Sequence, residues 1–180
     1  LPPDACLQIF EELDEARGAR LLALMDPQGA AEIISFLAPS DAKRYLGIPY
    51  KWGGTDPESG LDCSGLVQRV YADLGIDLPR VSGDQAKAGR PVASLAEAQP
   101  GDLIAFGSPV DHIGIYAGNG TWVVAPHTGA QVRLEKVDLS TATSIRRITS
   151  APVGDWAAAL PAAARPYAGA IARAAAAAGV

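Results

Sequence analysis

The chain has 180 residues, enough for one domain with appendages, and its 48% hydrophobic and 19% charged residues are typical of a globular protein. A net charge of −5 at pH 7 argues against a nucleic-acid-binding protein, which needs a basic face. No run of eighteen apolar residues predicts a membrane span, and two cysteines with two histidines argue against a disulfide framework or a structural zinc site. No metal and no cofactor are expected.

Residues 1–39 are acidic and carry a weak repeat of twelve residues, in which Asp14 recurs as Asp26 and Ala19 as Ala31. The pattern predicts a stack of short helices, each capped by its aspartate. It is similar to the helical N-terminal superhelix of the magnesium transporter MgtE and related flagellar-motor proteins. The favoured alternative is two or three ordinary helices packed on the next domain, with Cys6 in their core. Such a segment could also restrict access to a site that follows it.

Residues 40–150 predict an α+β domain in which helices come first and an antiparallel sheet follows. A short helix is expected at 42–46, and a loop of turn-forming residues at 53–60 leads into the run Leu61-Asp62-Cys63-Ser64-Gly65-Leu66-Val67. Cys63 should therefore lie in the first turn of a helix. There the free backbone N–H groups and the helix dipole favour a thiolate, the reactive form of cysteine. The alternative is a small buried residue that packs a helix start.

The second half of this domain predicts a short helix that opens with residues 80–85 and then a meander of strands. Pro100-Gly101-Asp102 introduces the first of them. Gly118-Asn119-Gly120 predicts a hairpin turn. The strands are expected at 103–106, 113–116, 121–125, 131–137 and 144–148.

Residues 151–180 change in composition, because fourteen of the twenty-four residues in 157–180 are alanine. They predict a helical linker, or the start of a further domain. The stretch 167–173 is similar to the opening helix of lytic-transglycosylase domains, which would imply such a domain beyond Val180. A linker or disordered tail is the alternative.

A nucleophilic cysteine needs a base within hydrogen-bonding reach and a third group that orients the base. His112 and His127 are the two histidines of the chain. His112 begins a predicted strand, and a strand end that faces a helix N-terminus could present its imidazole to Cys63. Tyr50 and Trp52 would add an aromatic wall beside the loop before Cys63.

Five motifs follow one another in an order that resembles the NlpC-type cysteine peptidases, bacterial cell-wall endopeptidases with a papain-like core. The resemblance covers about residues 40–150. The motifs are Tyr50-Lys51-Trp52-Gly53-Gly54, Asp62-Cys63-Ser64-Gly65-Leu66-Val67, Pro100-Gly101-Asp102-Leu103, Asp111-His112-Ile113-Gly114-Ile115-Tyr116 and Ala125-Pro126-His127-Thr128-Gly129.

The resemblance implies a secreted or envelope enzyme that hydrolyses peptidoglycan stem peptides. The bond would be the amide between D-glutamate, through its γ-carboxyl, and the diamino acid. Cys63 matches the nucleophile of the family and His112 its general base. The chain begins at Leu1 and shows no signal peptide, so we interpret it as a fragment or a processed form.

The resemblance also implies residues that hold the substrate. Asp62 and Ser64 match positions that bind the free amino end of the stem peptide, where an aspartate would pair with an ammonium group. Tyr50 matches an aromatic near the nucleophile, and Arg80 and Ser82 match positions that contact the diamino acid.

The chain departs from the family at the third catalytic position, a polar residue that is usually histidine and is Val124 here. A backbone carbonyl or a water could orient His112 and leave a slower dyad. His127 could serve if the chain turns at Pro126, because on an extended strand it would lie roughly 10 Å away and on the opposite face. The domain could instead bind stem peptides with little catalysis. An unrelated amidase or acyltransferase could share the Cys–His pair, although Tyr50 and Asp62 favour a peptide substrate.

Overall fold

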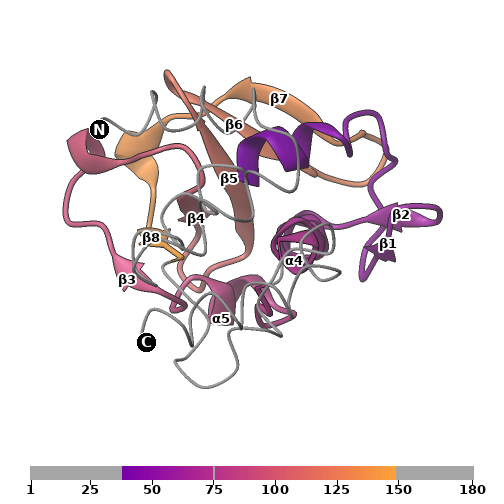
Figure 1. Ribbon diagram of the computed structural model, residues 1–180, viewed down its shortest axis with the longest axis horizontal. Helices are drawn as coiled ribbons and strands as arrows, with labels where there is room; N and C mark the ends of the chain where they lie inside the picture. The colour runs from indigo at the N-terminus through magenta and orange to yellow at the C-terminus, as the bar shows by residue number, and fades with distance from the viewer. Residues whose placement is uncertain (1–37, 75, 149–180) are drawn as a thin grey trace, which may run out of the picture.

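The computed structural model describes residues 38–74 and 76–148 (Figure 1). The predictions for the N-terminal repeat, Cys6 and the alanine-rich tail lie outside these residues. The described part is an α+β fold with a six-stranded antiparallel sheet, as expected. Within it, no helix is long and apolar enough to cross a membrane.

The described chain opens with helical residues 38–43, followed by turns through Gly47. The helix ends at residue 43, three residues before the end predicted at 46, so the prediction of a helix at 42–46 is wrong in its bounds. Ala38 and Ala42 are four positions apart on one helical face, and both are fully buried. Burial of this small-residue face decides where the helix lies.

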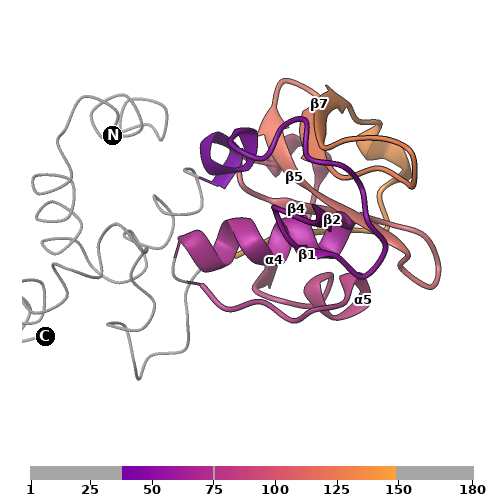
Figure 2. The same ribbon diagram turned by 90° about the vertical axis from the view of Figure 1, so that its right-hand side faces the viewer.

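Helix α4 spans Cys63–Asp73, so Cys63 opens a helix as predicted. Its apolar residues Leu66, Val67, Val70 and Tyr71 recur at helical spacing and are completely buried. Burial of a large apolar side chain of this kind contributes about 1.5–3 kcal/mol of transfer free energy. Figure 2 shows α4 lying along one face of the sheet, with the short helix α5, Ser82–Gln85, beside it.

The predicted loop before α4 contains a small two-stranded sheet, formed by β1 (Thr55–Asp56) and β2 (Gly60–Leu61). The main sheet has the order β3-β8-β4-β5-β6-β7. Its strands are β3 (Arg90–Pro91), β4 (Leu103–Phe106), β5 (His112–Gly118), β6 (Thr121–Val124), β7 (Arg133–Lys136) and β8 (Ser144–Arg147). Single-turn 3₁₀ helices lie at Leu95–Glu97 and Leu139–Thr141.

The predicted meander is confirmed for β4 to β7, and all five predicted strands are present within two residues of their expected ends. Asn119 and Gly120 have φ of 52° and 68°, the left-handed values that a tight two-residue hairpin turn needs. The prediction is incomplete at the edge formed by β3 and β8. Strand β8 returns to pair with β4. Strand β3 has only two residues, one of them a proline, and shows no recognisable strand pattern in the sequence.

Strand residues alternate between two apolar layers. Leu103, Ile113, Ile115 and Val123 face α4 and share its core with Cys63. The other face carries a second cluster, covered by loop segments and one 3₁₀ helix, whose buried members are Ile104, Tyr116, Trp122, Val124 and Ile145. The alternation is that of strands buried on both faces.

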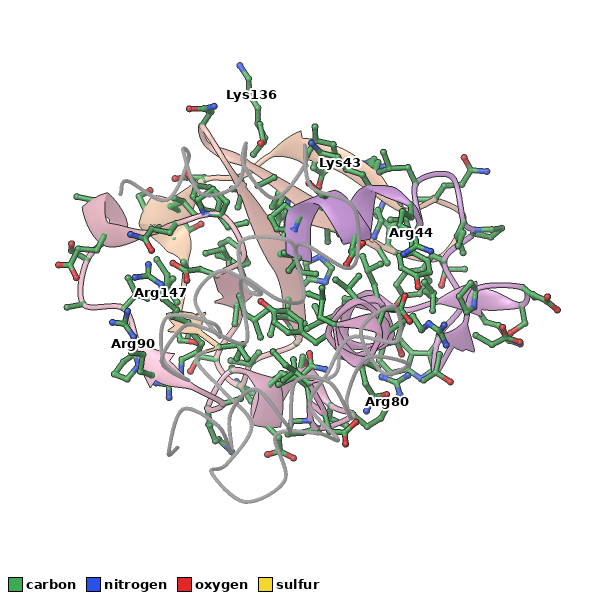
Figure 3. The ribbon with its side chains drawn as sticks, viewed as in Figure 1. Lys43, Arg44, Arg80, Arg90, Lys136 and Arg147 are labelled. Carbon is green, nitrogen blue, oxygen red and sulfur yellow. The ribbon has the colours of Figure 1, made fainter. Side chains whose placement is uncertain are left out.

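The Pro100-Gly101-Asp102 motif joins this sheet to α4. The Tyr71 hydroxyl of α4 donates to the carbonyl of Gly101. Asp102 is 1% exposed and accepts two hydrogen bonds of 2.8 Å from the guanidinium of Arg147 on β8. Arg147 lies opposite Arg90 of β3, the edge strand of the sheet (Figure 3). The motif therefore holds β4, β8 and α4 together.

We expect Asp102→Leu to lower the free energy of unfolding by about 3 kcal/mol, because it leaves the buried Arg147 guanidinium without its carboxylate. Urea denaturation measures this loss. Lys87→Gln is the matched control, since it breaks an exposed ion pair with Asp84 and should cost less than about 0.5 kcal/mol. An equal loss in both variants would contradict the role given to the buried pair.

Candidate active site

The candidate site is centred on Cys63, the first residue of α4, whose side chain is 7% exposed. It is a free thiol. The backbone N–H groups of Ile113, on β5, and of Ser64 both favour its thiolate. Ile113 directly follows His112, so the nucleophile candidate lies against the first residues of β5.

Asp62 caps α4 and holds the start of the helix in place. Its Oδ1 accepts from the Gly65 N–H at 2.7 Å, and its Oδ2 accepts from the Gly53 N–H at 2.9 Å. Arg80 donates to both oxygens, at 3.0 and 2.6 Å. Two charged hydrogen bonds and two backbone donors therefore hold one buried carboxylate.

Arg80 also donates to Ser64 Oγ at 2.8 Å, so the three predicted substrate residues Asp62, Ser64 and Arg80 form one cluster beside Cys63. Figure 3 shows Arg80 next to α4, well away from Arg147. Burial alone would raise the pKa of the Asp62 carboxyl, but the hydrogen bonds from Arg80, Gly65 and Gly53 together lower it. Asp62 is therefore a carboxylate at neutral pH.

The loop of residues 50–54, the aromatic loop, carries Tyr50 and Trp52 and packs directly on the start of α4. The Asp62 N–H donates to the carbonyl of Gly54 at 3.2 Å, and a side chain at Gly65 would collide with that same carbonyl. The absence of a side chain at Gly65 therefore lets the loop approach α4. The other end of the loop is fixed where the Tyr50 N–H donates to the Ala130 carbonyl at 2.8 Å.

Tyr50 and Trp52 have different environments within this loop. Tyr50 is half-buried, and burial raises its pKa, as do the nearby charges of Cys63 and Asp62. Trp52 is 83% exposed. The predicted aromatic wall next to the nucleophile is therefore formed by Tyr50, while Trp52 projects into solvent at its rim.

Gln85 is a buried residue of the site that the sequence analysis missed. It is fully buried, and its Nε2 donates to the carbonyls of Ser64 at 2.9 Å and of Pro79 at 2.7 Å. It thereby ties the segment that carries Arg80 to the first turn of α4. Ser82, from the same short helix, is half-buried, and its side chain makes no hydrogen bond to another residue that the structure describes.

His112 is the first residue of β5 and pairs with Phe106. Its ring packs edge-to-face on Trp122, with centroids 5.5 Å apart and an interplanar angle of 83°. The structure brings His112 and Cys63 to the same end of β5, although no hydrogen bond joins Sγ to the ring among the described residues. Catalytic hydrogen bonds are often long before substrate binds.

His127 lies after β6, in a turn closed by a hydrogen bond from the Ala130 N–H to the His127 carbonyl. This turn runs from His127 to Ala130, so it is not the turn at Pro126 that the use of His127 would require. His127 is exposed and its Nδ1 lies 3.0 Å from the Thr128 carbonyl oxygen. Its positive charge, when present, opposes that of His112. Its catalytic role stays a prediction.

The expectation that the helix start lowers the pKa of Cys63 is wrong. Burial raises the pKa of the Cys63 thiol, and the charge of Asp62 raises it further, outweighing the N–H groups of Ile113 and Ser64. Burial lowers the pKa of the His112 ring, while Asp111 and Glu135 raise it and His127 lowers it. Thiol and imidazole are therefore both neutral near pH 7, and a neutral imidazole is the form that can accept a proton.

The described residues contain no group of three or more histidine, cysteine, aspartate or glutamate side chains that could hold a metal ion. What they offer is a thiol, an imidazole and a charged cluster that can bind polar groups. This set of groups suits acyl transfer through a covalent thioester.

A sequence model of the NlpC/P60 family matches residues 47–149 of the chain. The bifunctional muramidase/DL-endopeptidase CwlT of Bacillus subtilis is 45% identical over 96 residues, which are 51% of this chain and 29% of that protein. The chain thus spans less than a third of the length of this curated relative.

Solved structures agree with the sequence comparison. The NlpC/p60 domain of the peptidoglycan hydrolase SagA superposes with a TM-score of 0.57 at 35% identity, covering 62% of this chain and 97% of that domain. The peptidoglycan hydrolase RipB of Mycobacterium tuberculosis gives a TM-score of 0.61 at 34% identity, covering 72% and 71% of the two chains.

We expect Asp62→Ala to lower the free energy of unfolding by about 2 kcal/mol at pH 7, because it removes both the helix cap and the partner of Arg80. Asp62→Asn keeps a capping side chain and should lose about half of that. The pKa of Asp62 is lowered in the folded protein, so this stabilisation is full at neutral pH and is lost as the pH falls through the folded-state pKa. Urea denaturation at neutral and acidic pH tests both statements, and a loss in Asp62→Asn that persists in acid would contradict them.

The neutral resting pair can be tested by alkylation of Cys63 with iodoacetamide, followed by mass spectrometry of its peptide. Because the pKa of the thiol is raised, we expect slow alkylation at pH 7. The rate should increase only when the pH exceeds the ordinary pKa of a thiol. The denatured chain is the matched control. Fast alkylation of the folded protein that is already maximal in mild acid would mean a thiolate–imidazolium pair.

Proposed function

Because the chain belongs to the NlpC/P60 family, we propose that it is a cysteine endopeptidase that cleaves peptidoglycan stem peptides. The bond is the amide between the γ-carboxyl of D-glutamate and the diamino acid. The observation that carries this proposal is Cys63 at the start of α4, against the β5 residues that follow His112 and beside the Asp62–Arg80 cluster.

In the proposed mechanism, His112 takes the proton of Cys63 as Sγ attacks the carbonyl carbon of the γ-glutamyl amide. The carbonyl oxygen becomes an oxyanion. The first N–H groups of a helix have no intrahelical acceptor, so the Cys63 N–H is the candidate donor to it. The imidazolium then protonates the amine as the C–N bond breaks, and water hydrolyses the thioester with His112 again as base.

The cluster beside Cys63 suits the amino end of a stem peptide. Asp62 is a buried carboxylate, and an ammonium group placed against it and Ser64 Oγ would complete a charged network with Arg80. Tyr50 supplies the adjacent wall. Arg80 and Ser82 would contact a carboxylate of the diamino acid, and the Arg80 side chain, 34% exposed, retains surface for it.

A second function, a module that binds stem peptides without cleaving them, is favoured by one observation. Val124, at the third catalytic position, is completely buried in the apolar layer, and its side chain has no polar atom to orient His112. Asp62, Ser64 and Tyr50 would serve binding equally well in such a module.

The proposed substrate places the protein outside the cytoplasmic membrane, in the envelope or secreted, with peptidoglycan as its partner. We keep the division into a helical segment 1–39, a peptidase domain 40–150 and an alanine-rich segment 151–180 as a proposal. The family match over 47–149 supports the central part of it.

The test is incubation with the peptide L-Ala-γ-D-Glu-diaminopimelate, with products followed by mass spectrometry. We expect cleavage at the γ-glutamyl bond by the parent and a loss of at least about a thousandfold in kcat with Cys63→Ala or His112→Ala. The N-acetylated peptide should raise KM, because it removes the ammonium group that Asp62 would pair with.

Peptide binding without turnover by the parent would support the binding module instead. Cleavage by Cys63→Ala at the parent rate would overturn both the mechanism and the assignment of the nucleophile. The thermal stability of Cys63→Ala, compared with that of the parent, separates lost chemistry from lost folding.

A further inference from the structure

The side chain that should orient His112 is missing from its expected place. Val124 on β6 lies in the apolar layer, completely buried, and cannot accept a hydrogen bond. A base that carries a positive charge during the reaction still needs a fixed orientation and a compensating charge. The residues that surround His112 on the same face of the sheet therefore decide whether it can act.

Trp122 fixes the position of the His112 ring. It packs edge-to-face on His112 and, at 5.3 Å and 73°, on Phe106. Gly114, two residues after His112 on β5, leaves space for the Trp122 ring, since a Cβ at this position would lie 2.6 Å from Trp122 Cε3. The indole Nε1–H is buried without a partner in the described residues, so packing alone holds this ring.

Glu135 on β7 brings a carboxylate to the same face. It lies opposite Trp122, and Arg133 lies opposite Val124 in the register of β6 and β7. Directly opposed residues of antiparallel strands share a face. Glu135 is half-buried there, and Arg133 Nε holds its Oε2 at 2.6 Å. Its neighbour Lys136 projects away from the sheet (Figure 3).

Three charged groups act on His112. Asp111 precedes it, Glu135 comes from β7 and His127 from the turn after β6. Arg133, also on β7, pairs with Glu135. Burial lowers the pKa of His112, and the charges of Asp111 and Glu135 act against it. Glu135 is thus near enough to favour the imidazolium.

On the basis of the Cys–His mechanism proposed above, we propose that Trp122 and Glu135 together replace the missing third residue. Trp122 holds the His112 ring in position, and the Glu135 carboxylate, from the strand next to Val124, stabilises the imidazolium formed when His112 takes the proton of Cys63. Both are positioning residues, because neither contacts the reacting atoms.

Glu135→Gln tests the electrostatic half of the proposal. We expect the NMR titration of His112 to move to lower pH, kcat to fall about tenfold and KM to stay within about twofold. Arg133→Gln should move the titration of His112 in the opposite direction, because it removes the cation that partly neutralises Glu135. Glu135→Asp should restore part of kcat, and Lys136→Gln should change nothing.

The opposite shifts in Glu135→Gln and Arg133→Gln separate a charge effect from general damage to β7. Assignment is simple, because the chain has two histidines and His127→Gln leaves one. An unchanged His112 titration in Glu135→Gln would overturn the role of Glu135. If Asp111→Asn alone moved it, Asp111 would be the compensating charge.

Trp122→Leu and Trp122→Phe test the packing half. We expect Trp122→Leu to lower kcat about tenfold at a KM within about twofold, and Trp122→Phe to keep most of the activity, because a ring still contacts His112. Equal activity in parent and folded Trp122→Leu would overturn this part. If the parent cleaves no stem peptide, the proposed function fails, while the NMR titration still decides the role of Glu135.

Discussion

The carboxylate of Asp62 is the constraint on which the site depends. It caps the helix that begins at Cys63 and accepts a hydrogen bond from the Gly53 N–H of the aromatic loop. It also accepts hydrogen bonds from Arg80 and Ser64. One buried group thus sets the position of Cys63, the proposed nucleophile, and of the cluster that would bind substrate. A buried carboxylate is stabilised only when its charged and hydrogen-bonding partners are present, because an unpaired buried charge is strongly destabilising.

The sheet supplies the other half of the site in a comparable manner. Asp102 and Arg147 close the sheet at β4 and β8, and Tyr71 connects the same motif to α4. The last turn of α4, which contains Tyr71, is thereby held against the sheet beside Tyr116. Cys63 belongs to the apolar layer that faces α4, whereas the His112 ring packs on Trp122 of the other layer.

Much of this arrangement could be predicted, because its signals are local. An aspartate before Cys-Ser-Gly and an apolar run indicates a capped helix, and Asn-Gly between two alternating stretches indicates a hairpin. The pairing of Asp62 with Arg80 spans 18 positions, and the register that sets Glu135 opposite Trp122 depends on how β7 docks. No local pattern encodes either contact. The direction in which the pKa of Cys63 shifts cannot be predicted for the same reason, since burial by distant segments outweighs the effect of the helix start.

A neutral, buried nucleophile has a consequence for durability. Oxidants react with thiolates, and their attack depends on exposure. Cys63 is 7% exposed and protonated at rest, so peroxide should convert it to sulfenic acid slowly. Under the proposed function the protein would work outside the reducing cytosol, away from the thioredoxin and glutathione pools that repair such damage. The features that make Cys63 a weak nucleophile at rest thus also preserve it until a substrate arrives.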